Sequence, residues 1–166
     1  MTDEAHAALV AALDRGEPFA AAEVERIDTH AAHVFLVDER AYKLKRPVTF
    51  SFLDFSTVEA RRRALENELR LNRRTAPELY LRMLPVTRSG DAFALDGDGE
   101  VVDWLLEMRR FPQAQKLDRI ADAGPLDPAL ARALGDVVAA FHRDAEPRRD
   151  KGGQDRKSTR LNSSHY

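Results

Sequence analysis

The chain has 166 residues, a formal net charge of −2 at pH 7 and no cysteine. This length suffices for one domain with its own core, and the mixed charges lack the basic excess of a nucleic-acid-binding surface. Disulfides and thiolate metal sites are excluded, and no apolar run reaches the length of a membrane span. We therefore expect a cytoplasmic protein with neither nucleic acid nor a membrane as partner.

The N-terminal part of the chain contains a predicted helix, a first strand and a turn. The helix covers residues 2–13, the strand residues 24–27 and the turn residues 29–32. His30 and His33 have the spacing of metal ligands only on a helix, where residues i and i+3 share a face. Because this pair bridges a turn and a strand, no metal site is predicted.

Two short strands follow, and the second carries two lysines. Residues 34–37 form a β-branched and aromatic run, and residues 41–45 alternate between apolar and basic side chains. Alternation directs Lys43 and Lys45 to the same face of this strand. The alternative is an edge strand whose lysines face water.

The linker that follows is unusually aromatic. Residues 47–55 contain three phenylalanines and a leucine, and alternation brings Phe50 and Phe52 together. We expect a hydrophobic plug between a sheet and a helix. The alternative is a docking surface for another domain.

A long charged helix is predicted after this linker, with Ser56 as N-cap of a capping box and an end near Arg74. Glu68 falls near the middle of its apolar arc, where a carboxylate requires a partner. Lys45 or Lys43 is the expected partner. The alternative places Glu68 at the edge of the arc, in contact with water.

The second half of the chain contains three further predicted strands and two helices. The strands cover residues 85–88, 92–95 and 100–108, and the last is near-continuously apolar, as in a central strand. One short helix is predicted over residues 113–123 and a longer one over residues 128–145. The longer helix carries an apolar stripe of Leu130, Leu134, Val137, Val138 and Phe141.

Four ordered sequence blocks carry a resemblance to a known family. They are His33–Leu36, Ala41–Val48, Phe52–Thr57 and Glu68–Arg74. Together they resemble the aminoglycoside phosphotransferase-like half of bacterial bifunctional aminoglycoside phosphotransferase/ATP-binding proteins, over about residues 24–141. The resemblance implies an α+β fold: a kinase-like N-lobe, made of a five-stranded antiparallel sheet with one packed helix, and the first helices of an incomplete C-lobe.

The resemblance also implies a nucleotide site with ATP as cofactor. In kinase-like folds a strand lysine holds the phosphates and a helix glutamate orients it. These roles fall on Lys45, with Lys43 as the rival, and on Glu68. The main chain of Ala31 and Ala32 would lie over the phosphates, and that of Glu107, Met108 and Arg109 would meet adenine. An ordinary strand exit at residues 107–109 is the alternative.

The catalytic part of such an enzyme is expected beyond this chain. Phosphoryl transfer needs a base near the acceptor hydroxyl and carboxylates for magnesium. Residues 142–144 read His-Arg-Asp, but they lie in helix register and Arg149 stands where an asparagine would be needed. We therefore predict no catalytic residue here, an inactive fragment of a phosphotransferase, and an unknown small-molecule phosphate acceptor. The alternatives are a non-catalytic regulatory module beside a C-terminal P-loop ATPase domain of the parent chain, and a structural domain without ligand.

The last twelve residues differ in character from the rest. Residues 155–166 lack apolar periodicity and resemble a translated sequencing adapter. We exclude them from the fold. The expected organisation is a kinase-like N-lobe over residues 1–108, a hinge and truncated C-lobe over residues 109–154, and a non-native tail over residues 155–166.

Overall fold

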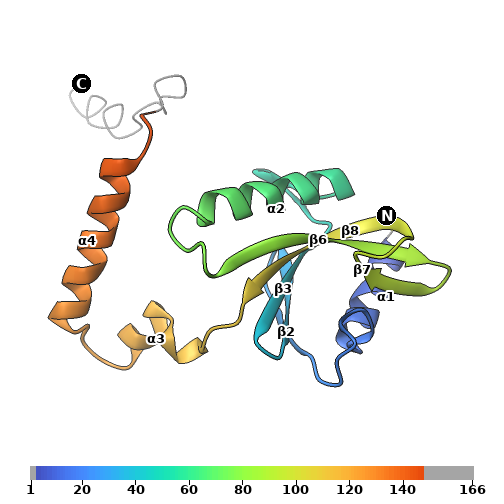
Figure 1. The fold of residues 1–166 in the computed structure, drawn as a ribbon, viewed down its shortest axis with the longest axis horizontal. Coiled ribbons are helices and arrows are strands. Elements are labelled where there is room, and N and C mark those ends of the chain that lie inside the picture. Colours follow the sequence, from blue (N-terminus) through green and yellow to red (C-terminus); the bar gives the residue numbers. More distant parts are fainter. Residues whose placement is uncertain (1–2, 148–166) are drawn as a thin grey trace, which may run out of the picture. The chain divides into compact units, whose positions relative to one another are not determined.

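The computed structural model describes residues 3–147 and is organised around a six-stranded antiparallel sheet with the strand order β1-β2-β3-β8-β6-β7 (Figure 1). The strands of this sheet are β1 (Glu25–Asp28), β2 (Ala32–Val37), β3 (Arg40–Lys45), β6 (Tyr80–Ser89), β7 (Ala92–Leu95) and β8 (Glu100–Arg109). A separate hairpin consists of β4 (Thr49–Phe50) and β5 (Leu53–Asp54). The α-helices are α1 (Asp3–Asp14), α2 (Val58–Asn72), α3 (Leu117–Asp122) and α4 (Pro128–Asp144). The fold class is therefore α+β, as predicted.

The sheet contains six strands, one for each strand predicted from the residue patterns, so the number of five implied by the resemblance is wrong by one. β7 pairs with β6 from Ser89 opposite Ala92 to Val86 opposite Leu95, and it forms one edge of the sheet. The turn between them contains Gly90 at φ 61, a conformation that glycine adopts at little steric cost. β1 forms the other edge, so β3 and β8 lie in the interior of the sheet.

Helices α1 and α2 pack on opposite faces of the sheet, which corrects the prediction of a single packed helix. Neighbouring residues of a strand point to opposite faces. Leu44 of β3 belongs to a buried cluster with Leu9 and Leu13 of α1, whereas the adjacent Lys43 bonds to Glu68 of α2. The core between α1 and the sheet is completed by Phe35, Leu84, Val86 and Leu105.

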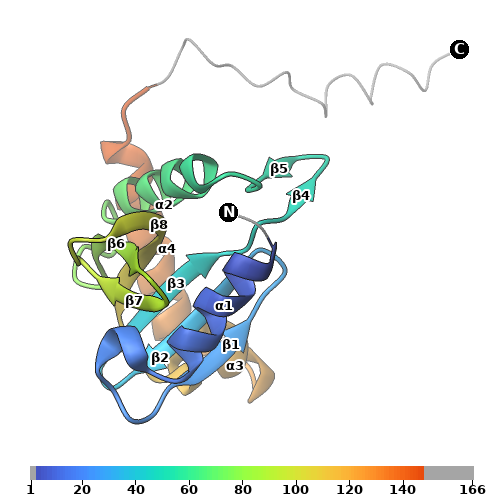
Figure 2. The same ribbon diagram turned by 90° about the vertical axis from the view of Figure 1, so that its right-hand side faces the viewer.

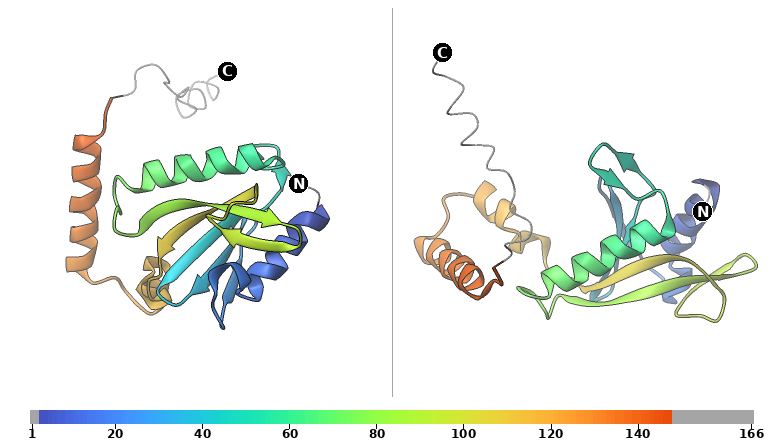
Figure 3. Two further views of the ribbon diagram at one scale, coloured as in Figure 1. Left: turned by 45° about the vertical axis from the view of Figure 1, so that its right-hand side comes forward. Right: turned by 90° about the horizontal axis from the view of Figure 1, so that it is seen from above.

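Helix α2 lies along β6 and β8, as the two views of Figure 3 show. Its N-cap is Thr57, whose side chain accepts a hydrogen bond from the main-chain N–H of Ala60 at 3.1 Å. The predicted N-cap, Ser56, is therefore wrong by one residue. The helix ends at Asn72, two residues before the predicted Arg74. Both threonine and serine cap helices well, so the sequence alone does not discriminate between adjacent caps.

The aromatic linker divides between core and surface. Phe55 is buried, with 8% of its surface exposed, and the centroid of its ring lies 5.3 Å from Lys45 Nζ of β3. Phe50 and Phe52 stack on each other in the β4–β5 hairpin at 5.8 Å, and Phe52 is 86% exposed. Figure 2 shows this hairpin projecting beyond α2. The predicted plug is therefore wrong for Phe50 and Phe52, because the hairpin turns their shared face outward.

The chain divides into two compact units, Met1–Ile120 and Ala121–Tyr166. The predicted hinge residues from 109 to 120 thus belong to the first unit. A single 3₁₀ turn at Gln113–Gln115 and α3 stand in place of the continuous helix predicted over residues 113–123.

The second unit contains α4, which begins as predicted. The Asp127 side chain accepts a hydrogen bond from the N–H of Ala129 at 2.8 Å, and Pro128 occupies the first turn. The predicted tail, residues 155–166, lies outside the described residues. Within residues 3–147, none of the helices combines the length and apolar character that crossing a membrane requires.

Candidate functional site

A carboxylate held by two ammonium groups is the centre of the candidate site. Lys43 and Lys45 point to the same face of β3, and α2 brings Glu68 over that face. Lys45 Nζ lies 2.7 Å from Glu68 Oε2, while Lys43 Nζ bonds to Glu68 Oε1. The predicted pairing of Glu68 with Lys45 or Lys43 is therefore present with both lysines.

Glu68 is mostly withdrawn from water, with 17% of its side chain exposed. Burial by itself raises the pKa of Glu68, but the hydrogen bonds and charges of Lys43 and Lys45 outweigh burial and hold this pKa below its ordinary value. The Asn72 side chain donates a hydrogen bond to the Glu68 carbonyl oxygen at 2.8 Å, which ties down the last turn of α2. Glu68 is thus an ionised group in a fixed position.

A cavity of about 490 Å³ adjoins Lys43 on the same face of the sheet. Its apolar wall consists of Ile27, Val34, Leu36, Ala41, Ala76, Leu79, Met108 and Phe111. Its basic residues are Lys43, Arg109, Arg110 and Lys116, and its other polar residues are Thr29, Asn72, Tyr80 and Gln113. No Asp or Glu occurs among the described residues that line it, so the charge of the lining favours an anionic ligand. Lys45 is absent from the same lining.

The segment predicted to meet adenine lies only partly in this cavity. Met108 and Arg109 line it, whereas Glu107 directs its side chain to the opposite face, where its oxygens lie 2.7 Å from Arg82 Nε and 3.3 Å from Arg40 Nε. The main-chain N–H of Arg109 donates to the Leu79 carbonyl oxygen at 2.8 Å. This N–H is therefore already engaged in a main-chain hydrogen bond.

Polar groups of the turn predicted to lie over the phosphates are already engaged in hydrogen bonds to neighbouring residues. The N–H of Ala32 donates to Thr29 Oγ1 at 3.0 Å, and the Ala32 carbonyl oxygen accepts from the N–H of Thr29 at 2.8 Å. The Ala31 carbonyl oxygen accepts from the N–H of Arg46 at 2.9 Å. Thr29 lines the cavity, whereas Ala31 and Ala32 are absent from its described lining. The structure thus brings Thr29, not these two alanines, to the site.

A buried ion pair between α2 and β8 supports the site. This pair was not predicted from the sequence. Arg61 of α2 lies 2.9 Å from Asp103 of β8, and both side chains are 0% exposed. Arg61 also donates to the main-chain carbonyl oxygen of Phe55 at 2.9 Å. The available signal was the position of Arg61 on the same helical arc as Glu68, where only a paired charge is tolerated.

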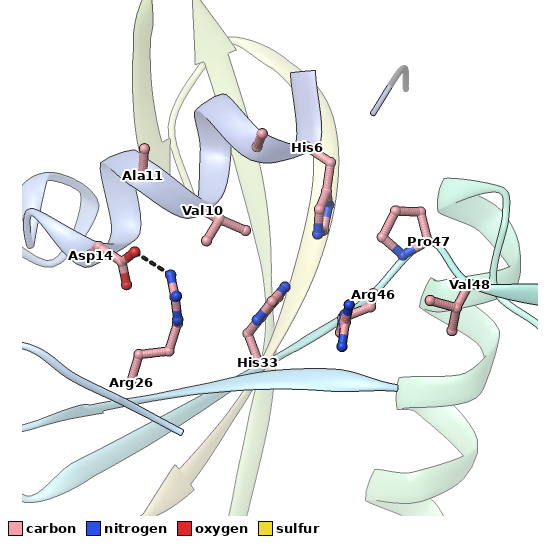
Figure 4. Close-up of a pocket in the computed structure, with 10 residues that line it drawn as sticks. His6, Val10, Ala11, Asp14, Arg26, His33, Arg46, Pro47 and Val48 are labelled. Atoms are coloured by element: carbon pink, nitrogen blue, oxygen red, sulfur yellow. Dashed lines mark hydrogen bonds and ion pairs between the residues drawn. The ribbon is translucent and has the colours of Figure 1, made fainter. Parts of the chain in front are cut away.

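A second cavity, of about 520 Å³, lies between α1 and the other face of the sheet (Figure 4). His6 and His33 approach each other across it with ring centroids 5.8 Å apart. Several of its polar groups are already engaged: Arg26 bonds to Asp14, Arg46 donates to the Thr29 carbonyl oxygen at 3.0 Å, and His33 Nδ1 lies 2.7 Å from Asp28. Within residues 3–147, no three His, Cys, Asp or Glu side chains are grouped so that they could hold a metal ion. We therefore regard the cavity beside Lys43 as the better candidate.

Comparison with known proteins finds relatives of much greater length. A protein of Mycobacterium bovis and proteins of two strains of Mycobacterium tuberculosis, each described as uncharacterized, are 37% identical to the chain over 134 residues. The match covers 80% of this chain but 24% of each relative, so the chain spans about a quarter of the length of the curated relatives it matches. No family model matches the chain. No solved structure matches it significantly.

Proposed function

We propose that the chain is the nucleotide-binding lobe of an ATP-dependent phosphotransferase of the aminoglycoside phosphotransferase-like type. The observation that carries this proposal is the contact of a strand lysine, Lys43, with a helix glutamate, Glu68, at the edge of a cavity suited to an anion. Kinase-like sites use such a pair to orient an ammonium toward nucleotide phosphates.

The lining of the cavity combines the apolar and the basic groups that a nucleotide ligand needs. Apolar side chains such as Val34, Ala41 and Met108 offer a surface for a flat base. Lys43 offers an ammonium for phosphate, and Arg109 and Lys116 add positive charge to the lining.

Lys43 is the better candidate for the phosphate contact, in contrast to the preference for Lys45 drawn from the sequence. Both ammonium groups reach Glu68, but Lys43 lines the cavity and Lys45 does not belong to its described lining. A ligand in the cavity would therefore meet Lys43 first.

The remaining parts of a phosphotransferase are proposed for the complete protein. Magnesium would arrive with the nucleotide phosphates or be held by residues outside the described part, since residues 3–147 contain no suitable group of ligands. The catalytic base and the pocket of the phosphate acceptor are assigned to the part of the complete protein that this chain does not include.

Calorimetric titration of the 166-residue chain with ATP, ADP and adenosine tests the proposal. We expect ATP to bind more tightly than adenosine, and Lys43→Met to weaken ATP binding about tenfold or more while adenosine binding stays unchanged. Glu66→Gln is the matched control, because Glu66 lies on the same helix and meets Arg62 at the surface, at 3.0 Å.

Two outcomes would contradict the proposal: no ATP binding by the wild-type chain, or equal ATP affinity in the wild type and Lys43→Met. In the complete protein, ATP binding without phosphoryl transfer would favour a regulatory module beside a P-loop ATPase domain over an enzyme.

A further inference from the structure

The two lysines that hold Glu68 differ in their surroundings. Each takes one oxygen of the carboxylate, so the three side chains together carry one positive charge more than they need for neutrality. A phosphate that takes one ammonium would still leave Glu68 neutralised by the other. A single lysine, by contrast, would have to serve the carboxylate and the phosphate together.

Lys45 is the lysine that contacts the buried part of the molecule. Its Nζ lies 5.3 Å from the centroid of the Phe55 ring, which is buried. The Phe55 carbonyl oxygen accepts a hydrogen bond from Arg61, and Arg61 is paired with Asp103 in the core. Lys45 is therefore the member of the Lys43–Glu68–Lys45 cluster that is held by buried neighbours.

Lys43 is the lysine that a ligand can reach. It lines the 490 Å³ cavity together with Ala41 of the same strand and Asn72 at the end of α2. A ligand phosphate in this cavity would reach Lys43 without displacing Lys45 from Glu68. The two lysines are thus placed for different tasks.

We propose that Lys45 is a positioning residue, which keeps Glu68 ionised and α2 in place while Lys43 binds a phosphate of the nucleotide. The proposal rests on the proposed nucleotide-binding function and adds a division of labour between the two lysines. Its physical basis is that a mostly buried carboxylate is costly without a cation, and more so beside an anionic ligand.

Proton uptake during ATP binding tests this division. Calorimetry in buffers of different ionisation enthalpy, at slightly acidic pH, measures the protons taken up per ATP. In Lys45→Met, no ammonium group would remain to neutralise Glu68 once an ATP phosphate binds Lys43. Glu68 would therefore take up a proton. We expect uptake above the wild-type value by up to about one proton per ATP. Lys45→Arg should restore the wild-type value, and Lys45→Met with Glu68→Gln should abolish the excess.

The outcomes separate this proposal from the proposed function. If wild-type protein binds no ATP, both are wrong. If Lys43→Met loses ATP affinity but Lys45→Met shows wild-type affinity and proton uptake, the function stands and the positioning role of Lys45 is overturned. The positioning role of Lys45 is also overturned if Lys45→Met loses the higher affinity for ATP over adenosine while Lys43→Met binds ATP as the wild type does. Should Lys45→Met not fold, Lys45→Gln replaces it, since glutamine keeps a hydrogen-bond donor but no charge.

Discussion

Arg61 of α2 and Asp103 of β8 form an ion pair without any exposure to water, with Arg61 Nη2 2.9 Å from Asp103 Oδ2. Further hydrogen bonds from Arg61 Nε reach both oxygens of Asp103, at 3.1 and 3.0 Å. The pair joins the first turns of α2 to an interior strand, and the same helix carries Glu68. The helix that holds Glu68 over β3 is therefore anchored by a contact outside the lining of the cavity.

Removal of one partner of this pair should destabilise the protein strongly. Arg61→Met removes the guanidinium from the buried Asp103 carboxylate and leaves only the His6 ring nearby, at 3.9 Å, so we expect a loss of about 3–5 kcal/mol in the free energy of unfolding. Urea unfolding followed by circular dichroism measures it. Arg63→Met is the matched control, because Arg63 is exposed on the same helix and its loss should change stability by at most about 0.5 kcal/mol. A similar small effect for both variants would show that the pair does not hold α2.

The stability contributed by Glu68 should depend on pH. Its pKa in the folded protein is lowered from the ordinary value of 4.5, so its contribution is present above pH 4.5 and is lost as the pH falls through the lowered pKa. Glu68→Gln should cost roughly 1–3 kcal/mol at neutral pH, and the difference from the wild type should shrink below pH 4.5. Urea unfolding across this range measures the difference. A difference that stays constant with pH would exclude an ionised Glu68 as its source.

Phe52, in the turn of the β4–β5 hairpin, and Phe55, directly after the hairpin, should respond differently to truncation. Phe55→Ala empties a buried site and should cost about 3–5 kcal/mol. Phe52→Ala removes a side chain that is 86% exposed and should change stability by no more than about 0.5 kcal/mol. Thermal unfolding of the two variants gives the comparison. Equal losses would mean that Phe52 is packed in solution.

Gly99 should not tolerate a methyl group. A Cβ at this position would lie 2.4 Å from the Arg88 carbonyl oxygen, and main-chain atoms of a paired strand cannot move aside cheaply. Gly99→Ala should therefore cost about 1–3 kcal/mol. Gly135→Ala is the contrast, because a Cβ there meets no described atom within 4 Å and alanine favours the helix. Wild-type stability in Gly99→Ala would contradict the close approach of residues 88 and 99.

The local patterns of the sequence determined much of the candidate site. Alternation along residues 41–45 predicted that Lys43 and Lys45 point to one face of the strand. Helical periodicity predicted that Glu68 lies on the face of α2 that packs against the sheet. The cap at Asp127 and the start of α4 were also readable. These features depend on backbone geometry over a few residues, which sequence spacing reports directly.

Only the tertiary structure decided which groups meet across the chain. Arg61 and Asp103 lie 42 residues apart, and they meet because α2 packs along β8. The pairing of β8 with β3 and β6 decides that Lys43 lines the cavity, that the Arg109 N–H is already bonded and that Glu107 points to the opposite face of the sheet. Spacing within one segment cannot specify this pairing, because it depends on the register between strands that are distant in sequence.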